Sequence, residues 1–294
     1  MLTNAMLSYV EERENGIKAI ITDKTGMVKV EAKKLIDATG DANAVQQAGY
    51  GVEKSTIQQP ATLQNSISGY DIEKVDVEQL RECFENADLP EYINADMLIG
   101  YLSMHKIDVH IPCEDADTSF GRTMLEKKAY AIMLKIYSFY RAIRGLENLN
   151  IDFVAEETGV RETNRIIGEY TITADEYING VMYDDAVCYS FYPIDLHVID
   201  GIRQAYHKAD IVSKIPYRSL VPKGAKHTIC AGRCISSDIY ANSAVRIQAT
   251  CMATGQVAGC AAGFACKSNA AVLDISLEEL KEALFNIRAI VPEK

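Results

Sequence analysis

The segment from Ile229 to Lys267 constrains the fold of this chain more than any other. A short apolar run ends at Gly232-Arg233, a polar loop follows, and from about Ala244 a long pattern rich in Ala and Gly predicts a helix. Strand ends in α/β sheets open onto crevices, and helix N-termini present unpaired N–H groups with a partial positive charge. The order strand, glycine turn, loop and helix therefore predicts a site for an anionic cofactor.

Three glycines recur at every fourth position of this predicted helix. Gly255, Gly259 and Gly263 share one helix face. Because glycine has no side chain, we expect a second backbone to approach this face closely.

Composition and charge exclude several classes of protein. With 294 residues the chain can bury a sizeable core, in one large domain or two modest ones. A net charge of −11 without a Lys/Arg block argues against a nucleic-acid partner. The start lacks the pattern of a signal peptide, and the most apolar helix, Val257 to Cys266, is too short to span a bilayer. With eight cysteines and no secretory signal, we expect reduced thiols and a cytoplasmic protein.

The N-terminal part predicts a helix followed by short strands. Residues 1–16 favour a helix that ends at Asn15-Gly16, and Ile17–Thr22 and Met27–Val30 favour a hairpin. Residues 34–38 form a third predicted strand, which ends at Thr39-Gly40-Asp41. Further helices are predicted over residues 42–48, 76–87, 95–105, 122–144 and 277–287, and a capping box is predicted at Thr173 with Glu176.

Three motifs in the same order resemble those of one enzyme family. The first is LIDATGD at residues 35–41, the second is GVRETNRIIGEYTIT at residues 159–173, and the third is YRSLVPKGAKHTICAGRCISS followed by ANSAVRIQATCMATGQVAGCAAG. They resemble FAD-dependent oxidoreductases of the heterodisulfide-reductase-A-like group, which are distant relatives of the fumarate reductase flavoproteins. The motifs span most of the chain.

The resemblance implies an α/β (α+β) fold. It implies part of a three-layer FAD/NAD(P)-binding domain with an inserted cap or substrate domain of helices and strands. On this basis residues 1–50 and 199–294 form the two parts of the FAD-binding domain, and residues 51–198 form the insert.

The resemblance also implies FAD as cofactor and a set of residues around it. Without the other motifs, an ordinary strand-ending turn would be the favoured explanation of Ala38-Thr39-Gly40. A helix packed in a core explains Gly255 without explaining why Arg233 and Arg246 occur together. The implied cofactor-binding residues are Thr39, Gly40, Asp41, Ala231, Gly232, Arg233, Arg246, Gln248 and Gly255.

Arg161, Arg165 and His197 are the candidate catalytic residues. On a strand, Arg161 and Arg165 would share one face and Glu162 would take the other. Two guanidinium groups suit a substrate carboxylate, whereas a salt-bridged strand with Glu162 pairing locally is the simpler alternative. Asn164 stands where the family usually has Arg. His197, in the segment YPIDLH, is a proton donor or acceptor or a hydrogen-bonded structural residue.

One family motif does not occur in the sequence. No GxGxxG is present, although the resemblance implies such a dinucleotide-binding unit ahead of the first motif. The chain therefore resembles a truncated member, which is an FAD-dependent oxidoreductase acting on a small substrate. The alternative is a non-catalytic fragment or a subunit that needs a partner chain to complete its FAD site. A hydrolase is a third alternative, for which the sequence offers no activated nucleophile.

Metal and cluster sites are not indicated. Cys230 and Cys234 form no CxxC pattern, and the spacing of His105, Asp108 and His110 suits neither a helix face nor a strand face. An iron–sulfur electron-transfer partner protein and a homo-oligomer are compatible with the resemblance.

Overall fold

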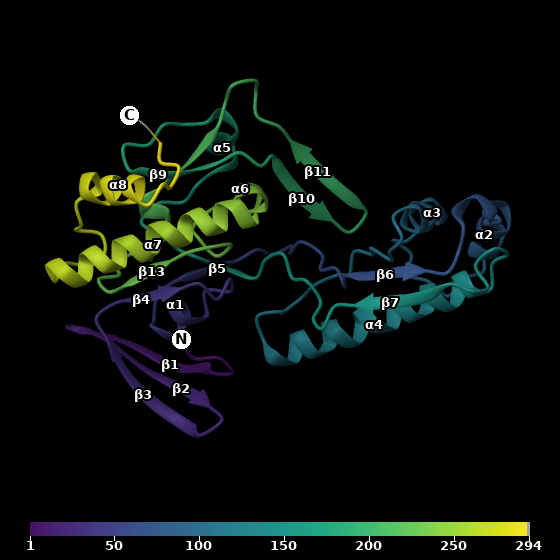
Figure 1. Ribbon diagram of the computed structural model, residues 1–294, viewed down its shortest axis with the longest axis horizontal. Helices are drawn as coiled ribbons and strands as arrows, with labels where there is room; N and C mark the ends of the chain where they lie inside the picture. The colour runs from purple at the N-terminus through teal and green to yellow at the C-terminus, as the bar shows by residue number, and fades with distance from the viewer. Residues whose placement is uncertain (293–294) are drawn as a thin grey trace. The chain divides into compact units, whose positions relative to one another are not determined.

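The computed structural model describes residues 1–292 of the chain. The chain folds as two compact units, which the ribbon in Figure 1 follows from the N-terminus to the C-terminus. Unit 1 comprises Met1–Thr56, Glu162–Leu196 and Arg203–Lys294, and unit 2 comprises Ile57–Arg161 and His197–Ile202. Residues 162–196 therefore lie in unit 1, whereas the predicted boundaries near 51 and 198 stay a prediction.

Unit 1 begins with a three-stranded antiparallel meander. It consists of β1 (Met6–Arg13), β2 (Gly16–Asp23) and β3 (Gly26–Ala32). The helix predicted over residues 1–16 is wrong, because Glu14-Asn15 forms the loop of a hairpin in which Arg13 pairs with Gly16. Val10, fully buried, packs into a small core that β1 and β2 share with Ala44.

The strands that carry the glycine turns form a parallel pair. β4 (Leu35–Asp37) pairs with β13 (Thr228–Cys230), with Ile36 opposite Ile229. Both strands agree with the sequence prediction, and α1 (Asn43–Gln47) follows the first of them. Within residues 1–292 this sheet has no further strand. Because the strands are parallel, both glycine turns leave the sheet at the same edge.

The long predicted helix is two helices. α6 (Ile239–Val245) ends at Arg246, and α7 (Gln248–Ser268) begins after Ile247, whose backbone is extended at φ −69° and ψ 145°. The predicted start at about Ala244 is therefore wrong.

The glycine face of α7 also differs from the prediction. The buried side of the helix consists of Thr250, Thr254, Val257, Ala258, Ala261, Ala262 and Ala265. Gly255, Gly259 and Gly263 are exposed, and a Cβ atom added to any of them would find no other described atom within 4 Å. The expected close approach of a second backbone is therefore wrong for residues 1–292.

The rest of unit 1 consists of short elements around the same core. β5 (Val52–Lys54) pairs with β8 (Asn164–Ile166), and β9 (Ala186–Ser190) pairs with β12 (Ser213–Pro216). α5 (Ala174–Asn179) begins with the predicted capping box of Thr173 and Glu176. The C-terminal helix α8 (Leu277–Asn286), predicted over residues 277–287, is capped by Ser276. A 3-10 helix lies at Tyr217–Leu220. The strands β10 (Ile194–Val198) and β11 (Gly201–Ala205) pair with each other, and each is divided between the units, because residues 197–202 belong to unit 2.

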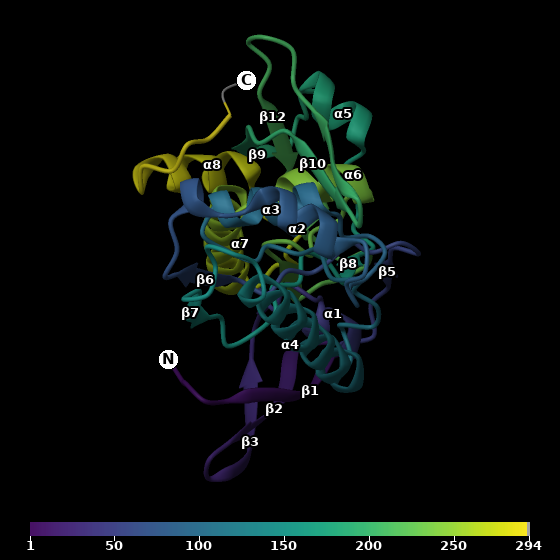
Figure 2. The same cartoon turned by 90° about the vertical axis from the view of Figure 1, so that its right-hand side faces the viewer.

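Unit 2 is built on three helices and one antiparallel strand pair. The helices are α2 (Val77–Phe84), α3 (Ala95–Ser103) and α4 (Ser119–Arg141), and all three were predicted with small shifts at their ends. β6 (Asn65–Ser68) pairs with β7 (Asn150–Val154), and a 3-10 helix lies at Ile72–Lys74. Figure 2 gives a second view of these elements.

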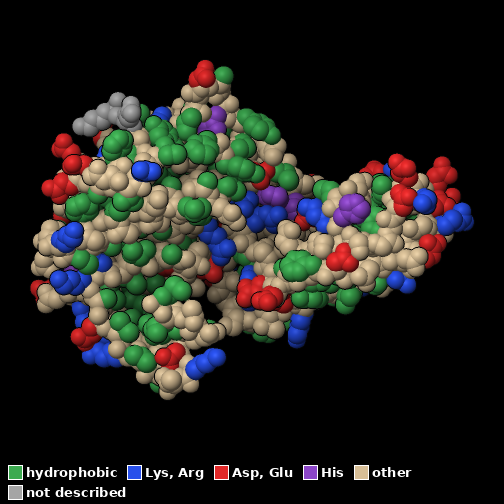
Figure 3. All heavy atoms as spheres, viewed as in Figure 1, with side chains coloured by type: hydrophobic (Ala, Val, Ile, Leu, Met, Phe, Trp, Pro, Cys, Tyr) green, Lys and Arg blue, Asp and Glu red, His purple; other side chains and the backbone are tan. Residues whose placement is uncertain are grey.

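The surface of unit 2 over α2 is acidic. Exposed carboxylates follow this helix and the loop after it, namely Glu78, Glu82, Glu85 and Asp88. Figure 3 shows acidic side chains gathered over the part of unit 2 that α2 and α3 occupy. Such a surface repels phosphate. Among residues 1–292, no helix has the length and apolar character needed to cross a membrane.

Candidate flavin site

Asp37 organises the turn that follows β4. Its Oδ1 accepts hydrogen bonds from the backbone N–H of Thr39 at 2.9 Å and from the Thr39 hydroxyl at 2.7 Å. Its Oδ2 accepts from the N–H of Val45 at 2.9 Å, within the first turn of α1. Asp37 is 1% exposed, so these bonds satisfy a buried carboxylate and fix the backbone of Thr39-Gly40.

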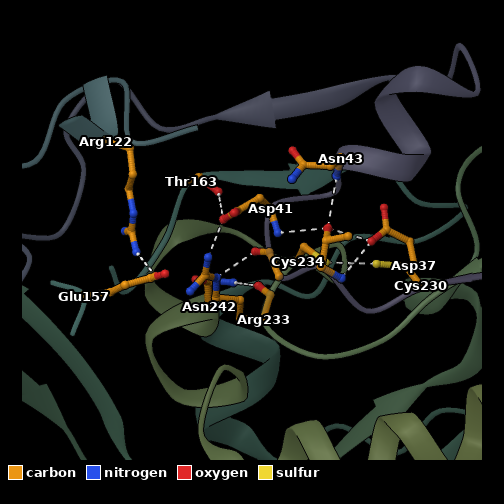
Figure 4. A network of polar contacts seen from close by, with 12 residues as sticks. Asp37, Asp41, Asn43, Arg122, Glu157, Thr163, Cys230, Arg233, Cys234 and Asn242 are labelled. Atoms are coloured by element: carbon orange, nitrogen blue, oxygen red, sulfur yellow. Dashed lines mark hydrogen bonds and ion pairs between the residues drawn. The ribbon is translucent and has the colours of Figure 1, made fainter. Parts of the chain in front are cut away.

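Arg233 joins this turn to the turn that follows β13. Its Nε donates to the carbonyl oxygen of Gly40 at 2.7 Å, and its guanidinium forms an ion pair with Asp41 (Figure 4). Asp41 also accepts a hydrogen bond from the Thr163 hydroxyl at 2.5 Å. Gly40 and Gly232 have φ of 78° and 87°, a region that glycine reaches without strain.

The second turn is also held from the sheet and from α7. The N–H of Ala231 donates to the carbonyl oxygen of Asp37 at 2.9 Å. The N–H of Gly232 donates to the Thr254 hydroxyl of α7 at 3.1 Å. The structure therefore brings together six of the residues predicted from the sequence, namely Thr39, Gly40, Asp41, Ala231, Gly232 and Arg233.

The other three predicted cofactor residues lie on or beside α7. Arg246 ends α6. Burial lowers the pKa of its guanidinium, and the positive charge of Arg233 lowers it further. The carboxylates of Asp195 and Glu162 act in the opposite direction without reversing the shift. Gln248 is the exposed first residue of α7. Gly255 lies on the exposed side of the same helix. Their contact with a cofactor stays a prediction.

Asn242 belongs to the site although the sequence placed it at a helix start. The short polar side chains of Asn242 and Ser243, ahead of the Ala/Gly-rich pattern, predict N-terminal caps of the long helix. This prediction is wrong, because both residues are buried inside α6 and Asp238 caps that helix. The Asn242 amide donates to the carbonyl oxygen of Arg233 at 2.8 Å. Its Oδ1 is buried and accepts no hydrogen bond from the described residues. The sequence signal that could have indicated this role is an asparagine within a segment otherwise rich in small and apolar residues.

The two arginines of the second motif do not share a face. Arg165 lies in β8 of unit 1, whereas Arg161 lies in unit 2. Arg165 and Glu162 form a buried ion pair at 3.0 Å, so the prediction that Glu162 occupies the opposite face is wrong. Only residues 164–166 are strand, and the chain bends at Thr163, between the two residues of the ion pair.

Arg165 is used inside unit 1. Its Nε donates to the carbonyl oxygen of Ser237 at 2.9 Å, and its Nη1 donates to the Ser55 hydroxyl at 2.9 Å. The bond to Ser237 holds the loop between β13 and α6, and the bond to Ser55 holds the residue that follows β5. The local ion pair that the sequence left open as an alternative is therefore present for Arg165.

In unit 2, Arg161 and His197 each contact neighbouring groups. Arg161 donates from Nη1 to the carbonyl oxygen of Pro60 and, at 3.1 Å, to the Thr62 hydroxyl. His197 Nδ1 lies 3.0 Å from His110 Nε2. Sequence reasoning considered His110 only as a metal ligand. The described residues contain no group of three or more His, Cys, Asp or Glu side chains arranged to hold a metal ion.

Two buried thiols lie beside the second turn. The Sγ atoms of Cys230 and Cys234 are 3.2 Å apart, and both side chains are fully buried. The contact with Cys234 and the burial raise the pKa of the Cys230 thiol. Cys230 therefore stays protonated at neutral pH.

A family model described as FAD dependent oxidoreductase matches residues 1–284. The chain belongs to this family. FAD is accordingly the cofactor of this FAD-dependent oxidoreductase. A comparison with curated proteins found none that matches the sequence.

The residues of unit 1 fit a flavin. Asn242 Oδ1 is a buried acceptor without a donor among the described residues, and the pyrimidine ring of a flavin carries an N–H donor. A Cβ atom added to Gly232 would meet only Cys251 Sγ, 4.0 Å away, so the space beside this turn is open. An open glycine turn next to an unsatisfied acceptor suits a planar, polar ring.

Proposed function

We propose that this FAD-dependent oxidoreductase belongs to the heterodisulfide-reductase-A-like group and acts on a small substrate that bears a carboxylate. The single observation that carries the proposal is the pair of turns joined by Arg233, whose carbonyl oxygen accepts a hydrogen bond from Asn242. The three motifs that suggested the group lie within the residues matched to the family.

The residues of unit 1 have distinct roles in this proposal. The Thr39-Gly40-Asp41 and Ala231-Gly232-Arg233 turns bind the cofactor through backbone groups. Asn242 accepts a hydrogen bond from the flavin ring, and Arg246 supplies positive charge. Gln248 begins α7, whose first N–H groups carry a partial positive charge. When bound, the flavin supplies the acceptor or donor of the hydride.

The residues of unit 2 are proposed to serve the substrate. Arg161 binds its carboxylate, because a guanidinium fork matches two carboxylate oxygens. His197 exchanges a proton with it, since imidazole titrates near neutral pH. A substrate role for Arg165 stays a prediction. Its bonds to Ser237, Ser55 and Glu162 support a structural role instead.

The cofactor site is proposed to need one more part of a parallel sheet. β4 and β13 form a pair without a third strand among the described residues, whereas parallel sheets are normally larger and covered on both faces. The sequence also contains no GxGxxG turn for a pyrophosphate. We infer that another segment or a partner chain supplies the strand and turn for the adenosine diphosphate half of FAD.

A fluorescence titration with three ligands tests the proposal. Riboflavin carries the ring alone, FAD carries the whole cofactor, and ADP carries the other half. We expect the chain to quench riboflavin and FAD fluorescence with dissociation constants within about tenfold of each other, and ADP to compete weakly. Strong competition by ADP, or no quenching of riboflavin, would show that the assignment of these residues to the ring is wrong.

A further inference from the structure

His110 contacts two successive residues of β10. Its Nδ1 lies 2.8 Å from the carbonyl oxygen of Val198, and its Nε2 lies 3.0 Å from Nδ1 of His197. The two imidazole rings are 5.1 Å apart between centroids and inclined at 68°. All three residues belong to unit 2. Because both contacts go to the same strand, the orientation of the His110 ring is fixed relative to His197.

The bond to Val198 determines which nitrogen of His110 carries a proton. A carbonyl oxygen only accepts hydrogen bonds, so Nδ1 of His110 is the donor. In a neutral imidazole the other nitrogen is then an acceptor. Nε2 of His110 therefore accepts, and Nδ1 of His197 must donate.

The surroundings of His110 favour its neutral form. Burial lowers the pKa of His110 first, and the Arg161 guanidinium lowers it further. The hydrogen bond to Val198 and the Asp108 carboxylate act in the opposite direction, and burial outweighs them. Asp108 is itself paired with Lys106, at 2.5 Å between Nζ and Oδ2. If His110 were protonated on both nitrogens, its Nε2–H would face the Nδ1–H of His197, and two donors would repel each other at a distance of 3.0 Å.

We propose that His110 is a positioning residue that fixes the tautomer of His197. It holds the proton of His197 on Nδ1, so that Nε2 is the nitrogen that gains and loses a proton. When Nε2 becomes protonated, the bond between His197 Nδ1 and His110 Nε2 persists unchanged. His197 can thus change charge without rearrangement of the pair. The tautomer of His197 follows from the contacts alone, and only the transfer of its proton to a substrate rests on the proposed function.

Nitrogen NMR of the apo chain tests the tautomer directly. Long-range proton–nitrogen spectra of histidine-labelled protein above neutral pH distinguish Nδ1–H from Nε2–H rings, and the sequence has only 5 histidines. We expect His110 and His197 to show the Nδ1–H form, which is the minor tautomer of a free histidine side chain. A wild-type spectrum with His197 in the Nε2–H form would overturn the inference, and it requires no variant.

His207 provides an internal reference. The Ser213 hydroxyl donates its proton to the carbonyl oxygen of Tyr177, so it must accept at its 2.6 Å contact with His207 Nε2. His207 is therefore expected in the Nε2–H form. The spectrum must show His207 and His197 as opposite tautomers.

His110→Phe keeps a ring at this position and removes both nitrogens. We expect His197 to shift to the Nε2–H form in this variant, whereas His105→Asn leaves it unchanged. His197 in the Nδ1–H form in His110→Phe would contradict the positioning role. The proposed function fails separately if the tautomers hold but His197→Gln leaves turnover of the flavin-loaded enzyme unchanged.

Discussion

Arg233 Nε and the carbonyl oxygen of Gly40 are 2.7 Å apart across 193 positions of sequence. One guanidinium thereby joins the two glycine turns that leave the β4–β13 pair, and it also contacts Asp41. A charged donor on a backbone carbonyl is among the stronger hydrogen bonds in proteins. The spacing between the turns therefore depends on this side chain.

The first prediction concerns Arg233 itself. Arg233→Ala removes the bond to Gly40 and leaves Asp41 without this cation, so we expect the free energy of unfolding to fall by about 2 kcal/mol. Riboflavin affinity should fall at least tenfold because the two turns lose their common anchor. Arg13→Ala removes an exposed pair with Glu11 and is the matched control, with no change in either measurement. Equal effects of the two variants would contradict the assignment.

The second prediction concerns the buried pair of Glu162 and Arg165. Their side chains are 1% and 3% exposed, so Arg165→Met removes one cation from a buried carboxylate. We expect a loss of about 3 to 5 kcal/mol in urea unfolding. Glu162→Gln combined with Arg165→Met should recover part of that loss, because the buried carboxylate that lost the Arg165 cation is replaced by a neutral amide. A double variant less stable than Arg165→Met would rule out this account.

The third prediction separates packing from cofactor contact on α7. Gly255→Ala and Gly263→Ala each place a methyl group in open space on an exposed helix face. Each should raise the free energy of unfolding by about 1 kcal/mol, since alanine favours a helix over glycine. Only Gly255→Ala is expected to weaken flavin binding, as this glycine is the one assigned to the cofactor. Identical flavin affinities for the two variants would remove Gly255 from the site.

The fourth prediction concerns pH. Burial lowers the pKa of His207 from its ordinary value of 6.5. The unfolded chain therefore binds this proton more readily, so the stability due to the neutral ring is complete above that value and is lost as pH falls below it. His207→Gln should show a smaller fall in melting temperature between about pH 7 and pH 5 than the wild type. A steeper fall of the melting temperature in the variant would contradict the lowered pKa of His207.

Local signals predicted the elements that carry the site. Short apolar runs followed by glycine indicated β4 and β13, and the structure confirms positive φ at Gly40 and Gly232. Thr173 and Glu176 are near in sequence, so their capping box could be read directly. These features depend on backbone preferences over a few residues.

Features that depend on distant partners were misread. The apolar residues of segment 1–16 lie near one face of a helix and so predict a helix, whereas pairing with β2 makes residues 6–13 a strand. The spacing of Arg161 and Arg165 predicts one strand face, but the strand begins only at Asn164, after a bend at Thr163. His110 lies 87 positions from His197, so no local sequence pattern predicts the contact between them.

The central claim is that Gly40, Gly232, Arg233 and Asn242 hold the flavin ring. Gel filtration of the purified chain after incubation with FAD, followed by its visible absorbance spectrum, tests it most directly. We predict a flavin band that elutes with the protein, is shifted from that of free FAD, and is lost in Arg233→Ala but kept in Arg13→Ala. A band equally retained by the wild type and both variants would contradict the claim.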